Sequence, residues 1–202
     1  MTIRKDIILA SASPRRREMF EEQGVPVEIV PADIDEDLPF AMSPEGAVMY
    51  LALAKADRVA EDHQGLIIAA DTIVVYNGEI MGKPQDEEDA FRMLSLLRGN
   101  VHQVITGVCL VDSREEPRRK ECLWDVTDVY FKDYSDEELR RYVETDEPYD
   151  KAGGYAIQMT FGKYIDHIDG DRDNVIGFPM YRIRKYLETN EAGSDPADGD
   201  KE

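Results

Sequence analysis

The sequence has few cysteines and no long hydrophobic run, and each absence excludes a class of protein. No stretch approaches the roughly 20 continuous apolar residues of a membrane helix, and the apolar segment near the N-terminus is too short for a secretory signal and has no cleavage site. Cys109 and Cys122 show neither CxxC spacing nor a nearby histidine pair, which argues against a zinc site and a disulfide framework. We therefore expect a cytoplasmic protein, without membrane contact, that carries two buried free thiols.

The sequence also lacks the basic excess that is typical of nucleic-acid-binding proteins. It contains 24 Lys and Arg residues against 43 Asp and Glu residues, and the net charge is −19. Such a charge repels polyanions, and no aromatic residues cluster beside basic ones as on single-strand-binding surfaces. Extended DNA or RNA is thus excluded as a partner. A small anion is not, because a few cations in a cleft can hold it while salt screens other charges beyond about 8 Å.

Segments with strand and helix character alternate along the chain, which predicts an α/β fold with a mixed sheet and flanking helices. We expect one domain over residues 1–190 and a disordered acidic tail over 191–202, which is too polar to bury a core. The expected strands cover residues 7–11, 27–31, two pieces of 65–80 on either side of Asp71, 102–113, 121–134, 156–159 and 164–168, and the expected helices cover 14–23, 43–62, 86–99, 135–145 and 179–187. Residues 169–180 have calcium-loop spacing without the loop's glycine and glutamate, which is typical of a solvated turn.

The first candidate site is the stretch SASPRRR, residues 11–17, which follows the first expected strand. Pro14 suits the first turn of a helix, so backbone N–H groups beside Ser11 and Ser13 would face an anion. Arginines in a first turn oppose the helix dipole by about 0.3 to 1 kcal/mol each, and a bound phosphate would offset that cost. An exposed basic turn paired with neighbouring glutamates explains the pattern equally well.

The second candidate is Asp71-Thr72 inside the run IIAADTIVV. A carboxylate in an apolar run is costly to bury unless it meets a metal, a cation or several donors. A functional aspartate is favoured over a structural one that bonds backbone amides at a strand break. Lys83 lies in a short loop between Gly82 and Pro84 that limits the reach of its amine, although most loop lysines are only solvated.

The segment EPYDKAGGYAIQ, residues 147–158, combines a cation with a flexible backbone. Its glycine pair permits close approach to a ligand, Lys151 supplies a positive charge, and Gln158 offers a donor and an acceptor to a base edge. The alternative is a glycine hinge with a surface lysine. Lys55 on the long helix and Glu36 in the stretch ADIDED are by default an exposed helix position and a solvated turn.

Taken together, these stretches resemble the Maf family of nucleoside triphosphate pyrophosphatases over nearly the whole chain. The matching motifs, in the family's order, are SPRR, IDED, Lys55 on its helix, AADTIVV, GKP, HQVITGV, DEPYDKAGGYAIQ and GDRDNVIGFP. The resemblance implies a Maf/ITPase-like fold with a central nucleotide-binding cleft. It further implies that Glu36, Asp71 and Lys83 are catalytic, that Glu36 and Asp71 bind a metal, and that the substrate is bound by Ser11, Arg15, Arg16, Lys55, Thr72, Lys151 and Gln158.

The segment DKAGGYAIQ looks like the subgroup that acts on dTTP and UTP, and modified pyrimidine nucleotides are a further candidate. The subgroup for methylated GTP departs from it at Lys151 and Gln158. The implied reaction is attack of water on the α-phosphorus, which releases pyrophosphate and leaves a nucleoside monophosphate. A divalent cation, Mg²⁺ with Mn²⁺ and Co²⁺ as the other candidates, would acidify the water that Asp71 orients. The resemblance also implies a homodimer and housecleaning of the nucleotide pool, with a nucleotide-binding regulator of septum formation as the rival function.

Overall fold

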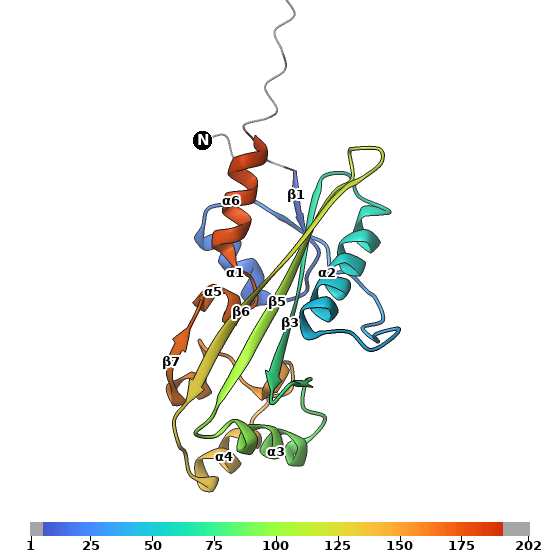
Figure 1. The fold of residues 1–202 in the computed structure, drawn as a ribbon. Helices are drawn as coiled ribbons and strands as arrows, with labels where there is room; N and C mark the ends of the chain where they lie inside the picture. The colour runs from blue at the N-terminus through green and yellow to red at the C-terminus, as the bar shows by residue number, and fades with distance from the viewer. Residues whose placement is uncertain (1–5, 192–202) are drawn as a thin grey trace, which may run out of the picture.

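A seven-stranded mixed sheet forms the centre of the protein in the computed structural model, which describes residues 6–191 (Figure 1). The strands are β1 (Ile7–Leu9), β2 (Glu28–Ile29), β3 (Leu66–Tyr76), β4 (Glu79–Met81), β5 (Val101–Asp112), β6 (Arg119–Phe131) and β7 (Ile165–Asp169). Their order is β2-β1-β3-β5-β6-β7, and β4 pairs with β3. The pairs β1–β2 and β1–β3 are parallel and the others are antiparallel, so the predicted mixed sheet is confirmed.

Helices cover both faces of this sheet, as Figure 1 shows for α2 on one side and α1, α5 and α6 on the other. The helices are α1 (Pro14–Glu22), α2 (Pro44–Ala60), α3 (Glu87–Leu97), α4 (Asp136–Val143), α5 (Arg172–Ile176) and α6 (Met180–Glu191), with short 3₁₀ segments η1 (Ala152–Gly154) and η2 (Thr160–Tyr164). Within residues 6–191, no helix is both long enough and apolar enough to span a bilayer. Separate apolar cores lie under α2, under α1 and α6, and beside α3 and α4.

Side chains cap the helices at three of the expected starts, residues 43, 86 and 135. The Ser43 and Asp86 side chains accept hydrogen bonds from the backbone N–H groups of Gly46 and Asp89, and Ser135 with Glu138 forms a capping box at the start of α4. Each cap satisfies one of the N–H groups that a helix leaves without an internal partner. The expected starts of α2, α3 and α4 are therefore confirmed.

Three local predictions are wrong. β3 is one continuous strand and does not break at Asp71, because Asp71 pairs in register with Gly107 of β5. Residues 156–159 form turns and not a strand. The segment expected to be a solvated turn contains α5, capped by the Asp171 side chain, and its Asn174 is fully buried. The expected disordered tail, apart from Glu191, lies outside the described residues.

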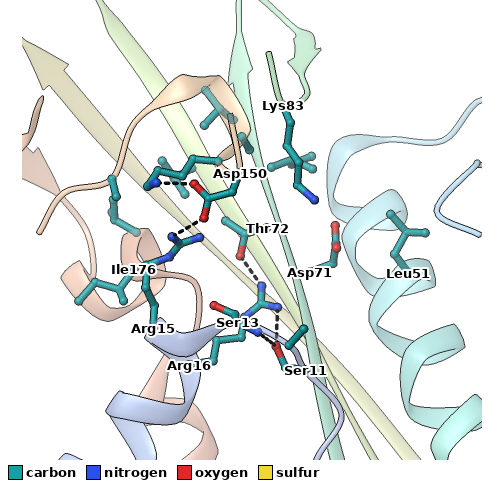
Figure 2. A pocket seen from close by; sticks show the side chains of 18 of the residues that line it. Ser11, Ser13, Arg15, Arg16, Leu51, Asp71, Thr72, Lys83, Asp150 and Ile176 are labelled. Atoms are coloured by element: carbon teal, nitrogen blue, oxygen red, sulfur yellow. Dashed lines mark hydrogen bonds and ion pairs between the residues drawn. The ribbon is translucent and has the colours of Figure 1, made fainter. Parts of the chain in front are cut away.

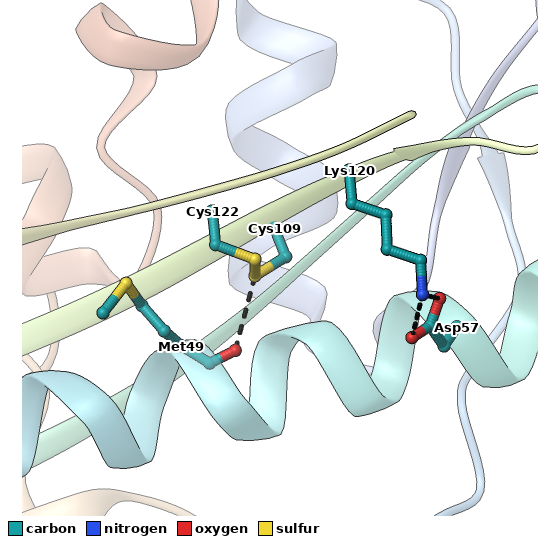
Figure 3. The surroundings of a disulfide bond; sticks show 5 residues. All are labelled: Met49, Asp57, Cys109, Lys120 and Cys122. Carbon is teal, nitrogen blue, oxygen red and sulfur yellow. Dashed lines mark hydrogen bonds and ion pairs between the residues drawn. A yellow bond between two sulfur atoms is a disulfide. The ribbon is translucent and has the colours of Figure 1, made fainter. Parts of the chain in front are cut away.

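The prediction of free thiols is also wrong. Cys109 and Cys122 lie directly opposite each other on β5 and β6 and are joined by a disulfide (Figure 3). Cys109 Sγ lies 3.3 Å from the Met49 carbonyl oxygen of α2. Sequence spacing carries no sign of this bond, and only the pairing register of the two strands brings the sulfur atoms together.

Gly107 brings helix α2 unusually close to the sheet. A Cβ atom on this residue would lie 2.6 Å from the Val48 carbonyl carbon and 2.7 Å from the Met49 nitrogen, both in the backbone of α2. Only glycine leaves room for this approach. Because α2 also carries Lys55, the contact at Gly107 determines how far that lysine reaches over the sheet.

We expect Gly107→Ala to lower the free energy of unfolding by about 1 to 3 kcal/mol, since the added methyl group overpacks a backbone contact. The matched control is Gly46→Ala in α2, where the nearest atom to an added Cβ lies at 3.4 Å. That change should leave stability unchanged or raise it by about 0.5 to 1 kcal/mol. Urea unfolding of both variants tests this, and equal stabilities would show that α2 does not depend on the glycine.

A second prediction concerns acid stability. His102 is 2% exposed and its Nε2 lies 2.6 Å from the Tyr155 hydroxyl oxygen. Burial lowers the pKa of His102 to about 3, whereas an unfolded chain has a histidine pKa of about 6.5. Between about pH 3 and about pH 6.5, His102 is protonated in the unfolded chain but stays neutral in the folded protein. The free energy of unfolding is therefore highest above about pH 6.5 and decreases as the pH falls.

The free energy of unfolding of the wild type, minus that of His102→Gln, should therefore decrease by up to about 1.4 kcal/mol for each pH unit below about pH 6. Glutamine removes the titrating group and retains polarity. Urea unfolding of both proteins at about pH 7, 6 and 5 measures the difference. A difference that does not change with pH would mean that burial does not hinder protonation of His102, because the folded and unfolded chains would then bind its proton equally well.

Candidate active site

A cleft of about 540 Å³ opens at one edge of β3. On this edge β1 pairs with Leu66–Ile68 and β4 pairs with Val74–Tyr76, so among the described strands none pairs with residues 69–73 there. The cleft is lined by Ser11, Arg15, Arg16, Glu36, Lys55, Asp71, Thr72, Lys83, Lys151 and Gln158, which are all ten residues that the sequence analysis singled out. Figure 2 shows several of them converging from β3, α1 and the loop after β4.

Lys55 joins the two predicted carboxylates. Its Nζ lies 2.7 Å from Glu36 Oε1 and 2.7 Å from Asp71 Oδ1. Burial acts to raise the pKa of Glu36, but the hydrogen bond and charge of Lys55, with the charges of Lys83 and Arg16, outweigh burial and lower that pKa. Glu36 is thus ionised at neutral pH, and the two carboxylates converge on one cation.

Arg16 is held mainly by the protein itself. Its Nε donates to the Gly177 carbonyl oxygen at 2.8 Å, its Nη1 donates to the Ala70 carbonyl oxygen at 2.8 Å, and its Nη2 donates to Thr72 Oγ1 at 3.0 Å. A longer contact of 3.4 Å joins Nη1 to Ser11 Oγ. Desolvation lowers the pKa of the Arg16 guanidinium. These bonds use most of its five N–H donors, so Arg16 fixes the cleft wall and has little capacity left for a ligand.

Arg15 and Lys151 meet at a carboxylate that the sequence analysis did not single out. Asp150 accepts from Arg15 Nη1 at 3.3 Å, and its other oxygen contacts Lys151 Nζ (Figure 2). Burial acts to raise the pKa of Asp150, but the hydrogen bond and charge of Lys151 and the charge of Arg15 lower it. Lys151 is only 5% exposed and also donates to the Glu147 carbonyl oxygen. Asp150 therefore holds the two cations at one wall of the cleft.

The remaining predicted residues lie around the mouth of the cleft. Lys83 and Gln158 are exposed, and the loop of Lys83 is tied to the 147–158 segment because Gly153 N–H donates to the Gly82 carbonyl oxygen at 3.0 Å. The Ser13 side chain makes no capping bond at the start of α1, which leaves the N–H groups of the first turn available to an anion.

Two buried residues behind the cleft also escaped the sequence analysis. Thr106 on β5 contacts Thr72 Oγ1 at 2.9 Å, and Asn174 of α5 accepts from Thr106 through its backbone oxygen at 2.9 Å. Both are fully buried. They belong to the motifs HQVITGV and GDRDNVIGFP, so the signal available in the sequence was a polar residue inside an apolar strand and another beside an acidic turn.

The donor set fits a divalent metal that is shared with a substrate. Within residues 6–191, no group of three or more His, Cys, Asp or Glu side chains could hold a metal ion. Glu36 and Asp71 supply hard oxygen ligands from two sides of one point. Mg²⁺ is commonly bound by one or two carboxylates together with water and substrate phosphates, and this pair of carboxylates suits that mode of binding.

Comparison with a solved structure supports the fold assignment. The Ham1 protein of Staphylococcus aureus superposes with a TM-score of 0.53 over 92% of this chain and 100% of its own, at 14% sequence identity. At this identity the likeness concerns the fold alone. It agrees with the Maf/ITPase-like α/β architecture that the sequence predicted.

Relatives with much higher identity cover nearly the whole chain. The "dTTP/UTP pyrophosphatase" of Alkaliphilus oremlandii is 46% identical over 189 residues, which is 92% of this chain and 96% of that protein. The protein of the same name from Caldicellulosiruptor bescii is 44% identical and covers 91% of this chain and 94% of its own. Residues 6–190 match the family model of a Maf-like protein. The motif residues that meet in one cleft, the matched length and these identities together establish that the chain belongs to the Maf family.

Proposed function

We propose that this protein hydrolyses dTTP and UTP to the nucleoside monophosphate and pyrophosphate, and thereby removes such nucleotides from the pool. The observation that carries the proposal is that one cleft holds both a converging pair of carboxylates and several cations, on a chain whose net charge is −19. The names of the 44–46% identical relatives support the choice of substrate. Modified pyrimidine nucleotides are a further substrate class for the same cleft.

The cations of the cleft are suited to bind the triphosphate. Arg15 lines the cleft from the first turn of α1, where backbone N–H groups are also available, and Lys83 approaches from the loop after β4 (Figure 2). One cation–phosphate pair at about 4 Å gains about 4 kcal/mol before desolvation at an effective dielectric near 20. A few such contacts are enough to hold an anion that the rest of the surface repels.

The carboxylates are suited to the reacting end of the substrate. Glu36 and Asp71 would hold the divalent cation, for which Mg²⁺ is the first candidate and Mn²⁺ and Co²⁺ are the others. When bound, the ion would neutralise phosphate charge and ease deprotonation of water. Asp71 would orient the attacking water toward the α-phosphorus. Lys55, which contacts both carboxylates, would keep them from repelling each other before the substrate arrives.

The departing pyrophosphate gains negative charge as the bond to the α-phosphorus breaks. Arg15 and Lys83 are positioned to stabilise that charge, and fixed cations act strongly where charge develops in the transition state. Arg16 would contribute indirectly, because its bonds to Ala70, Thr72 and Gly177 fix the wall of the cleft.

The proposed activity predicts metal-dependent release of pyrophosphate from dTTP and UTP. Asp71→Asn and Lys83→Ala should each lower kcat at least about 100-fold, the scale expected when one charge-stabilising group is lost. Lys132→Ala is the matched control, since Lys132 is an exposed lysine outside the cleft, and it should retain full activity. Tight nucleotide binding without pyrophosphate release under any divalent metal would favour the regulator of septum formation instead.

A role of Glu36 in metal binding predicts a shift in metal dependence. Glu36→Gln should raise the Mg²⁺ concentration for half-maximal activity at least about tenfold, since removal of groups that support a bound metal typically costs 10- to 100-fold in affinity. Asp37→Asn is the control, because Asp37 is an exposed neighbouring carboxylate that does not line the cleft. Equal Mg²⁺ dependence in the two variants would remove Glu36 from the metal site.

A further inference from the structure

Asp150 places a negative charge in the cleft that binds an anion in the proposed reaction. Its side chain lines this cleft beside Arg15 and Lys151. Burial acts to raise the pKa of Asp150, but the hydrogen bond and charge of Lys151 and the charge of Arg15 lower it, so the carboxylate is ionised at neutral pH. An ionised carboxylate repels phosphate, so Asp150 has a role other than attraction of the substrate.

The two oxygens of Asp150 contact different cations. Oδ2 accepts from Arg15 Nη1 at 3.3 Å, whereas Oδ1 contacts Lys151 Nζ (Figure 2). Lys151 is buried and also donates to the Glu147 carbonyl oxygen. A buried ammonium group needs a partner, and Oδ1 provides one that does not involve Arg15. The Arg15 guanidinium can therefore leave Asp150 while Lys151 stays paired.

Arg15 is held by this single bond to Asp150. Within residues 6–191, its side chain makes no other hydrogen bond or ion pair, whereas three protein oxygens accept from Arg16 at 3.0 Å or less. A guanidinium has five N–H donors, and its planar shape suits phosphate. Because the Asp150 side chain is 63% exposed, its pair with Arg15 is weak and a phosphate can replace it.

We propose that Asp150 occupies the place of a phosphate at Arg15 until the substrate binds, and that it thereby limits the affinity of the cleft for polyphosphates. The inference rests on the proposed function and deepens it. Once a phosphate takes Arg15, Asp150 remains with Lys151 and its charge acts against the bound anion. Product release limits the turnover of many enzymes, so a carboxylate at this wall helps pyrophosphate to leave.

The test measures the affinity of the full-length protein for inorganic pyrophosphate by calorimetry at a fixed Mg²⁺ concentration, which requires no turnover. Asp150→Asn retains the size of the side chain and removes its charge. We expect this variant to bind pyrophosphate about fivefold more tightly than the wild type, the upper end of the effect of one exposed ion pair. Asp150→Glu restores the charge and should restore the wild-type affinity.

Asp146→Asn is the matched control. Asp146 is an exposed carboxylate of the same loop that does not line the cleft, so its loss changes the net charge equally and should leave the affinity unchanged. If Asp150 served only to orient Arg15, Asp150→Asn would bind pyrophosphate more weakly than the wild type. Weaker or unchanged binding would overturn the proposal, and so would an equal gain in Asp146→Asn or Asp150→Glu.

If Asp150→Asn does not fold, Asp150→Ala removes the same charge without placing an amide group against Lys151 and is read in the same way. Absence of measurable pyrophosphate binding in both the wild type and the variant would also overturn the proposal. Pyrophosphate release from dTTP and UTP is measured separately in the wild type. Its absence would refute the proposed hydrolysis, while the pyrophosphate affinities would still decide the role of Asp150.

Discussion

The cleft depends on one ammonium group placed between two carboxylates. Glu36 comes from the segment before α2, and Asp71 comes from the middle of β3. Without Lys55 between them, two ionised carboxylates directed at one point would repel each other, and one of them would tend to take up a proton. Lys55 reaches both at 2.7 Å because α2 lies against the glycine of β5. The packing of a helix on the sheet thus sets the electrostatics of the site.

The arginine run after β1 shows how one turn of helix distributes equivalent side chains among different tasks. Arg15 faces the cleft and Asp150, Arg16 turns inward to bind three other segments of the chain, and Arg17 is exposed and pairs with Glu21. Successive residues on a helix point about 100° apart. Three adjacent arginines therefore cannot all contact one phosphate, and here only Arg15 combines a place in the cleft with a carboxylate partner that a phosphate could replace.

The sequence predicted those parts of the fold that depend on local chemistry. The expected helix starts at Ser43, Asp86 and Ser135 are short-range patterns, and all three residues cap helices in the structure. The errors involve contacts between distant segments. Asp71 was expected to interrupt its strand, but Lys55 compensates its charge and the strand continues.

One physical reason explains why the sequence did not predict the roles of several polar residues: their partners lie far away along the chain. Threonine is frequent in strands for its shape alone, so Thr106 carries no sign that its hydroxyl is bonded on both sides. In the sequence, Asp150 cannot be distinguished from other acidic loop residues. Only the folded structure brings Arg15 within 3.3 Å of its carboxylate. In the same way, only the register of β5 and β6 reveals the disulfide of Cys109 and Cys122.

Residues 69–73 of β3 pair with β5 on one edge, but no strand within residues 6–191 pairs with them on the other edge. An open strand edge offers backbone groups on which another chain could add a strand, and such edges promote aggregation. Arg16 covers the Ala70 carbonyl oxygen, and the net charge of −19 keeps other copies of the chain at a distance. The acidic surface that seemed to oppose an anionic ligand thus also protects the edge where that ligand would lie.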